Sequence, residues 1–331
     1  MKPQHLIHFI AACLIACLGS GTAHAGAPPK YFERALWVWD AGVIVEAGPQ
    51  STLMAFCKQH DIALLYVSTA RVFGEAGQAK KPPISRAQLG AFVRRAHAQG
   101  IKVHGLDGDP GFARRDKHAL ALARLERALD YNAMAPPEER LDGWQWDTEP
   151  YLLPDFKTPA GRRQILVEFL DSAQQMRDAI EKHDAVQPPV AHSFALGYAI
   201  PFWLDNRENA VSWNGADKAA TFHLMDILNA LPASYIAIMA YRDRAEGPNG
   251  SIALTEGEAR YATQKAPRVR VWIGQETLDV KGDPPSITFW QEGASELEKA
   301  IAQIGSHYAA TPAVAGVAIH HWESYRLLTE R

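Results

Sequence analysis

The stretch L-D-G-W-Q-W-D-T-E-P-Y, residues 141–151, reads as a β-strand with a polar face. Strand side chains alternate between two faces, so Gln145, Asp147 and Glu149 are expected to project together, and Pro150 to end the strand. Burying two carboxyl groups and an amide on one face costs free energy unless these groups are paired or used. We therefore expect this stretch to be the chemical centre of the protein and the remaining chain to be its scaffold.

Predicted strands and helices alternate along the rest of the chain. The other predicted strands are residues 35–40, 62–67, 101–106, 189–195, 235–241, 268–274 and 314–322. The predicted helices are residues 50–60, 85–99, 117–130, 159–183, 219–231, 255–263 and 294–307. Regular strand–helix alternation predicts a parallel sheet.

The number of these units decides between two kinds of parallel sheet. Eight strand–helix units in about 300 residues predict a single α/β domain, a closed (β/α)8 TIM barrel. A doubly wound open sheet is the alternative, but no glycine-rich phosphate-binding loop follows the first predicted strand. Active sites of such barrels lie at the C-terminal ends of the strands, so candidate site residues are sought there.

The N-terminal residues 1–25 resemble a secretory signal peptide. Lys2 is followed by an apolar run over 6–18 and by the small-residue site that ends at Ala25. The apolar run is shorter than the roughly 20 residues that cross a bilayer, so no transmembrane anchor is expected. A lipobox-like sequence that ends at Cys17 leaves lipidation as the alternative. In both cases we expect an exported protein, either periplasmic or secreted.

The composition of the predicted mature domain, residues 26–331, excludes several classes of protein. Cys57 is its one cysteine, so no internal disulfide is expected, and its apolar neighbours predict a buried thiol. The net charge of −3 gives no reason to expect binding to nucleic acid or to an anionic membrane. We expect a monomer that uses no cofactor.

Carboxylates and aromatic residues gather at the predicted strand ends, as expected of a carbohydrate site. Sugar rings stack on aromatic side chains, while their hydroxyl groups need polar partners at fixed positions. The predicted substrate-binding residues are Trp39, Asp40, Gln145, Met239 and Trp322. Trp144 and Trp146, on the other face of their strand, are interpreted as core residues that face the helices.

Glu149 is the candidate proton donor for cleavage of a glycosidic bond. Such cleavage needs an acid beside the leaving oxygen and a second group that stabilises positive charge on the sugar. Asp147 lies two residues away on the same face, so ionising both carboxyl groups is unfavourable and the pKa of one should rise. The alternative for this pair is a structural salt bridge to an arginine or lysine.

The central stretch resembles a glycosidase signature. Residues 142–149 are similar to the D-G-x-D-x-D-x-E signature of family 18 glycoside hydrolases, the chitinase-like barrels. The segment 239–241 resembles the M-x-Y element of that family, and Trp322 its strand-eight tryptophan. Gln145 and Arg242 stand where the family has aspartate.

This resemblance implies a role for each matching residue. Glu149 would be the acid/base, and Asp147 would orient the N-acetyl group of the substrate, whose oxygen is the nucleophile. Tyr241 would assist that oxygen.

A second resemblance implies a different nucleophile. Thr148-Glu149-Pro150 is similar to the N-E-P turn on strand four of clan A retaining glycosidases. In that case Glu149 is still the acid/base, and Glu276 at the end of strand seven is the nucleophile, with the two carboxyl groups roughly 5–5.5 Å apart.

Two other classes of function compete with a glycosidase. A metal-dependent hydrolase would need ligands at the strand ends, but no H-x-H or H-E-x-x-H spacing is present, so no metal site is expected. A non-catalytic glycan-binding barrel would keep the aromatic residues and would not need Glu149 or Asp147. The sequence therefore predicts an exported glycoside hydrolase that acts on a poly- or oligosaccharide.

Overall fold

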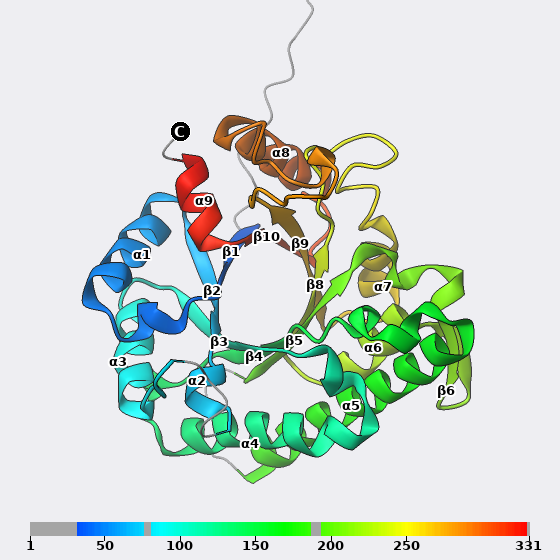
Figure 1. Ribbon diagram of the computed structural model, residues 1–331, viewed down its shortest axis with the longest axis horizontal. Coiled ribbons are helices and arrows are strands. Elements are labelled where there is room, and N and C mark those ends of the chain that lie inside the picture. The colour runs from blue at the N-terminus through cyan, green and yellow to red at the C-terminus, as the bar shows by residue number, and fades with distance from the viewer. Residues whose placement is uncertain (1–31, 76–80, 187–192, 330–331) are drawn as a thin grey trace, which may run out of the picture.

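Eight parallel strands close into a barrel, as the sequence predicts (Figure 1). The computed structural model describes residues 32–75, 81–186 and 193–329. Around the barrel the strand order is β1-β10-β9-β8-β5-β4-β3-β2. The strands are β1 (Glu33–Val38), β2 (Ile62–Ser68), β3 (Lys102–Asp107), β4 (Gly143–Trp146), β5 (Ala195–Pro201), β8 (Ser234–Met239), β9 (Val269–Glu276) and β10 (Val314–His320).

Helices surround the barrel on its outside (Figure 1). They are α1 (Ala47–Gln59), α2 (Ala70–Phe73), α3 (Arg86–His97), α4 (His118–Met134), α5 (Pro159–Val186), α6 (Ala220–Leu228), α7 (Glu256–Gln264), α8 (Ala294–His307) and α9 (Trp322–Thr329). An antiparallel hairpin, β6 (Ala210–Trp213) with β7 (Ala216–Ala219), is inserted between β5 and α6. Together with the closed sheet, this arrangement confirms the (β/α)8 TIM barrel.

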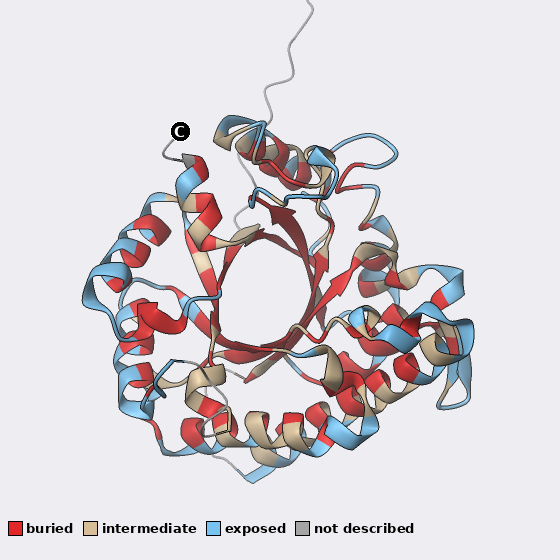
Figure 2. Cartoon of the chain, in the orientation of Figure 1, coloured by how far each residue is buried: buried red, intermediate tan, exposed pale blue. Residues whose placement is uncertain are grey.

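Aromatic side chains fill the inside of the barrel. Trp37, Tyr66, Tyr235 and Trp272 are almost fully buried there, and Figure 2 shows the strands as the most buried part of the chain. Small residues on facing strands make room for these rings. A Cβ atom on Gly197 would lie 2.0 Å from the ring of Tyr235, so only glycine fits at this position. The barrel is therefore a packed core, and the space for a ligand is at its ends.

The outer faces of the strands pack against the helices. Trp144 and Trp146 on β4 are buried in the hydrophobic cluster that joins the barrel to its helices, which confirms that they face the helical layer. On the opposite face of the same strand, Gln145 points into the barrel, where its Oε1 accepts a hydrogen bond of 2.6 Å from Trp37 Nε1. The predicted alternation of this strand is thus correct for its first half.

Two strand boundaries differ from the prediction. Strand β4 ends at Trp146; the backbone N–H of Asp147 still bonds to Asp107 O, and the chain then leaves the sheet. The fifth strand was predicted over 189–195, of which 187–192 lie outside the described residues. It is observed at Ala195–Pro201, where Gly197 admits the ring of Tyr235. The hydrophobicity of the segment alone does not show that this strand must make room for the ring of Tyr235.

The C-terminal segment also differs from the prediction. Trp322 was expected on the last strand, but β10 ends at His320 and Trp322 is the first residue of α9. Within the ranges that the structure describes, no helix is both long enough and apolar enough to span a bilayer. The predicted signal peptide and the alternative lipidation site at Cys17 lie outside those ranges.

Candidate active site

Glu149 lies at the C-terminal mouth of the barrel, three residues after the end of β4. Its backbone is in the left-handed region, with φ of 48°, which is uncommon for a residue that is not glycine. Pro150 follows and begins the 3₁₀ turn η5 (Pro150–Leu152). The hydroxyl of Tyr151, in the same turn, donates a hydrogen bond to Glu149 Oε1. This strained connection, rather than a continuing strand, sets the direction of the Glu149 side chain.

Asp147 is the second carboxyl group of the predicted pair. Its Oδ1 is buried and has no hydrogen-bond partner among the described residues. Burial, and then the negative charge of Glu149, raise the pKa of Asp147 to about 8. One pKa of the pair is raised, as predicted, but it is that of Asp147, so at neutral pH Asp147 carries the proton.

The alternative for this pair, a structural salt bridge to an arginine or lysine, is not what the structure shows. Ion pairs at this end of the barrel involve other carboxylates, such as Asp107 with Arg124 at 3.0 Å and Glu276 with His320 at 2.8 Å. Asp147 and Glu149 therefore remain free of a cationic partner in the described part of the chain.

Tyr241 connects the two sides of the mouth. It follows β8, and its pKa is well above the ordinary value because of burial and, next, the negative charge of Glu276, with further contributions from Asp147 and Glu149. The ring of Tyr241 lies over Gly274 on β9, where an added Cβ would be 3.1 Å from Tyr241 Cε1. Strand ends far apart in the sequence thus bring four of the predicted catalytic residues to one place.

Glu276 ends β9 and is held by three hydrogen bonds. Its Oε1 accepts from the backbone N–H groups of Thr277 and Leu278, both at 2.8 Å, and its Oε2 lies 2.8 Å from His320 Nδ1. Glu276 exposes only 4% of its surface. These three contacts fix the orientation of the Glu276 carboxyl group at the end of β9.

His320 links Glu276 to Trp39, a predicted substrate-binding residue. Trp39 Nε1 lies 2.9 Å from His320 Nε2, and an indole nitrogen can only donate. Nε2 of His320 is therefore the acceptor, and Nδ1 carries the proton that is donated to Glu276. Trp39 is still 37% exposed, so this chain of hydrogen bonds fixes an accessible aromatic ring at the mouth.

The other predicted substrate-binding residues divide into two groups. Met239 ends β8 and is partly buried, and Asp40 is exposed, caps a 3₁₀ turn through Gly42 N and pairs with Lys81 at 3.1 Å. Both lie at the mouth. Gln145 is 0% exposed and lies within the core of the barrel, so it cannot contact substrate as predicted.

Trp322 does not have the predicted position either. It is only 6% exposed and packs in the hydrophobic cluster between barrel and helices, with the guanidinium of Arg326 5.7 Å from its ring centre. The start of α9 turns its side chain into that cluster. We therefore remove Gln145 and Trp322 from the candidate substrate contacts.

The alternative of a metal-dependent hydrolase finds no support in the described ranges. They contain no group of three or more His, Cys, Asp or Glu side chains that could hold a metal ion. His104, at the end of a predicted strand, is buried inside the barrel with its Nδ1 2.9 Å from the hydroxyl of Tyr235. Burial lowers the pKa of His104 to about 4, so it is a neutral core residue.

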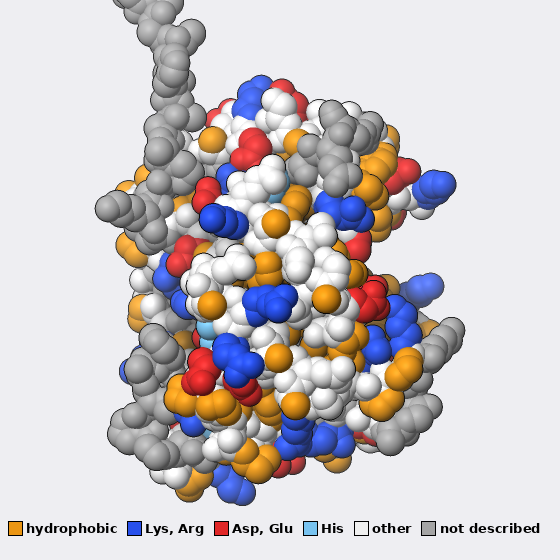
Figure 3. Space-filling model, turned by 90° about the vertical axis from the view of Figure 1, so that its left-hand side faces the viewer, with side chains coloured by type: hydrophobic (Ala, Val, Ile, Leu, Met, Phe, Trp, Pro, Cys, Tyr) orange, Lys and Arg blue, Asp and Glu red, His pale blue; other side chains and the backbone are white. Residues whose placement is uncertain are grey.

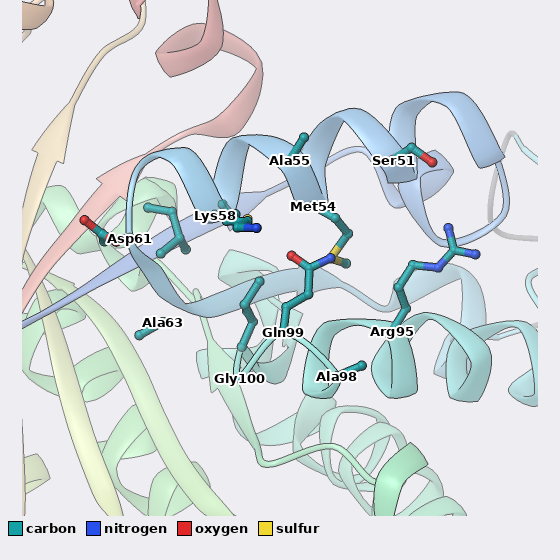
Figure 4. A pocket seen from close by; sticks show the side chains of 13 residues that line it. Ser51, Met54, Ala55, Lys58, Asp61, Ala63, Arg95, Ala98, Gln99 and Gly100 are labelled. Atoms are coloured by element: carbon teal, nitrogen blue, oxygen red, sulfur yellow. The ribbon is translucent and has the colours of Figure 1, made fainter.

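A large groove lies at the opposite end of the barrel. It has a volume of about 830 Å³ between α1 and α3, near the start of β2, and Lys58, Arg95 and Gln99 are among its lining residues (Figure 4). Cys57 beneath it is buried, as predicted, and burial raises the pKa of its thiol to about 12. Figure 3 shows both signs of charge interspersed on this side. The groove is therefore separate from the mouth and contains none of the predicted catalytic residues.

Solved structures share this fold at low sequence identity. The family 1 β-glucosidase from Thermotoga maritima superposes with a TM-score of 0.55 at 8% identity, over 88% of each chain. The GH39 enzyme from Xanthomonas axonopodis pv. citri gives a TM-score of 0.52 at 10% identity, over 90% of this chain and 60% of that one. No family model and no curated protein matches the chain.

The family 18 resemblance is not confirmed by these comparisons. A family 18 chitinase from Cycas revoluta has 13% identity over 87% of this chain and 94% of its own, with a TM-score of 0.48. That value is too low to support membership. The comparisons establish the barrel, which is the fold of glycoside hydrolases of several families.

Two residues of the site were not predicted. Tyr151 is the last residue of the central stretch 141–151, but its role depends on the turn that brings its hydroxyl back to Glu149. His320 falls within the predicted strand 314–322, but its link to Glu276 depends on the pairing of β9 with β10, which sets the two residues side by side. The strand order of a barrel would have shown this neighbourhood, since the last two strands are adjacent.

Proposed function

We propose that this protein is a glycoside hydrolase that cleaves a poly- or oligosaccharide at the C-terminal mouth of the barrel. One observation carries the proposal: Asp147 and Glu149, which follow β4, and Glu276, which ends β9, lie close enough to Tyr241 at this mouth for all three carboxyl groups to raise its pKa. An exposed aromatic ring, Trp39, lies beside them. Carboxyl groups next to an aromatic platform suit the cleavage of a glycosidic bond.

Glu149 is the proposed general acid and base. Its carboxyl group lies beside the turn η5 and is oriented by the hydroxyl of Tyr151. Asp147 carries a proton at neutral pH, because its own pKa is raised to about 8. As the acid, Glu149 must hold a proton of its own, and the neutral Asp147 then adds no second charge beside the carboxylate that forms when this proton passes to the leaving oxygen.

Two groups could stabilise the positive charge that develops on the sugar. In the first mechanism, the N-acetyl group of the substrate attacks and Asp147 and Tyr241 assist it. In the second, Glu276 attacks and forms a covalent glycosyl-enzyme. The hydrogen bonds to Glu276 hold its carboxyl group in one orientation, as a nucleophile requires, so both mechanisms are proposed.

The test is a hydrolysis screen on amino-sugar polymers and neutral glucans. Glu149→Gln should lower kcat by about 10²–10⁴-fold while leaving thermal unfolding and glycan binding nearly unchanged. Dependence on Glu276 as well would favour the covalent mechanism. Full activity of Glu149→Gln would exclude the proposed role, whereas binding without hydrolysis by the wild type would indicate the non-catalytic glycan-binding barrel.

Export of the protein is part of the same proposal. It rests on the signal-like residues 1–25, and lipidation at Cys17 is the alternative. Mass spectrometry of the N-terminus of the mature protein distinguishes the two forms.

A further inference from the structure

A second cluster of carboxyl groups lies away from the mouth residues, at the start of α7. Glu258, in the first turn of this helix, exposes 1% of its surface. Neither Oε1 nor Oε2 of Glu258 has a hydrogen-bond partner among the described residues. A bare carboxylate is costly to bury, so a positively charged species or a proton must neutralise it.

Asp205 brings a second negative charge to the same place. It ends the 3₁₀ turn η7 (Phe202–Asp205), which follows β5. Its Oδ2 lies 3.3 Å from the position that a Cβ on Gly257 would occupy, so it packs against the backbone next to Glu258. The two carboxyl groups therefore compete for the same compensating charge.

The unpartnered atoms favour a cation over a proton. A proton shared by the two carboxyl groups would satisfy one oxygen of Glu258 and leave the other without a partner. A calcium ion accepts both oxygens of one carboxylate and a further carboxylate from a neighbouring segment.

We propose that Asp205 and Glu258 bind a calcium ion that joins η7 to α7. The two side chains supply part of the oxygen shell, and backbone carbonyl groups and water complete the six to eight ligands that calcium takes. This site is independent of the proposed hydrolysis. Its effect reaches the mouth through Trp203 in η7, whose ring packs edge-on at 5.2 Å against Tyr151, the partner of Glu149. Calcium binding would fix this wall of the mouth.

The test is thermal unfolding of the full chain after treatment with EDTA. Calcium at about 100 times its Kd should raise Tm by about 4 °C, and magnesium at the same concentration should raise it less. Glu258→Gln and Asp205→Asn should each lose this rise. Glu256→Gln is the matched control, because Glu256 is on the same turn but exposed, and the variant should keep the full rise.

Other outcomes would overturn the proposal. One is a Tm of the wild type that does not respond to calcium, and another is a Glu258→Gln variant whose Tm rises with calcium as much as that of the wild type. If Glu258→Gln fails to fold, the terbium luminescence of the wild type is compared with that of Asp205→Asn instead. Terbium sensitised by Trp203 in the wild type, and at least tenfold weaker in Asp205→Asn, supports the site. Equal emission from both proteins contradicts it.

Discussion

The hydroxyl of Tyr151 donates a hydrogen bond to Oε1 of Glu149, which lies two residues earlier in a left-handed backbone conformation. The donor and the acceptor belong to one short turn, so the hydrogen bond between them is local. Tyr151 in turn packs against Trp203, which follows a different strand. The position of the proposed acid/base is therefore determined by a local turn that a neighbouring loop supports.

Replacing Tyr151 with phenylalanine should disturb Glu149 without disturbing the fold. The variant keeps the ring that packs on Trp203 and loses only the hydroxyl. A hydrogen bond to a charged group contributes about 1.5–3 kcal/mol, so kcat should fall by about 10–100-fold. Hydrolysis rates and Tm measure the two effects separately. Tyr261→Phe, on the outer helix α7, is the control and should leave kcat unchanged; a Tyr151→Phe variant with wild-type kcat would argue against orientation of Glu149 by this hydroxyl.

The stability of the protein should depend on pH through Asp147. The pKa of Asp147 is about 8 in the folded state, against 3.8 for the ordinary group, so between these values the folded state binds a proton that the unfolded chain has lost. Stability from this site is thus greatest at low pH and decreases as pH rises toward 8. The amide introduced by Asp147→Asn cannot ionise, so the free energy of unfolding of this variant, relative to wild type, should increase by about 1.4 kcal/mol per pH unit in this range.

Urea unfolding at several pH values measures this difference. Comparison with the wild type matters, because Glu258 also has a raised pKa and contributes a slope of the same sign in both proteins. Parallel pH profiles for Asp147→Asn and wild type would mean that Asp147 is ionised in the folded protein.

Trp39 should contribute to glycan affinity in two separable ways. Trp39→Ala removes the exposed ring and should raise KM by about tenfold, or ~1.4 kcal/mol. Trp39→Phe retains an aromatic face but loses the N–H that His320 accepts, so we expect an increase of about threefold. Nitrogen-15 NMR of the wild type should show His320 protonated on Nδ1. Protonation on Nε2 instead would contradict the link from Trp39 to Glu276.

Gly274 should be intolerant of any side chain. A Cβ there would lie 2.6 Å from Ile238 O and 3.1 Å from the ring of Tyr241. Gly274→Ala should therefore destabilise the protein by about 1–3 kcal/mol and displace Tyr241, lowering kcat as well. Gly48→Ala, at an exposed position of α1 with nothing within 4 Å, is the control and should be neutral or stabilising by up to about 1 kcal/mol. Equal stability of both variants would show that the strand moves to accept the methyl group.

The fold was predictable because its signals are periodic and local. Apolar runs alternate with amphipathic segments, and parallel strands covered on both faces leave continuous hydrophobic runs such as β2. The fifth strand was misplaced because its observed residues are selected by a contact across the barrel, that of Gly197 with Tyr235. Such a contact is set by which strands face one another, and the amino-acid pattern of one strand does not contain it.

The candidate site was predictable where chemistry follows a strand end. Glu149, Asp147, Tyr241 and Glu276 were found in this way. Gln145 was assigned to the site because strand alternation places it on the same face as Asp147. It lies two residues before Asp147, however, and is therefore buried below the mouth. Side-chain depth along a barrel axis depends on the stagger of the strands, which the sequence of a single strand does not show.

The aromatic packing inside the barrel has a consequence for substrate entry and product release. Trp37, Tyr66, Tyr235 and Trp272 close the interior below the mouth, so the described part of the chain leaves no passage along the barrel axis. A glycan must enter and its fragments must depart by the same opening. A product fragment has to leave before the next glycan binds, and a fragment that stays on Trp39 occupies the binding position of that glycan. Release, as well as bond cleavage, therefore sets a limit on turnover.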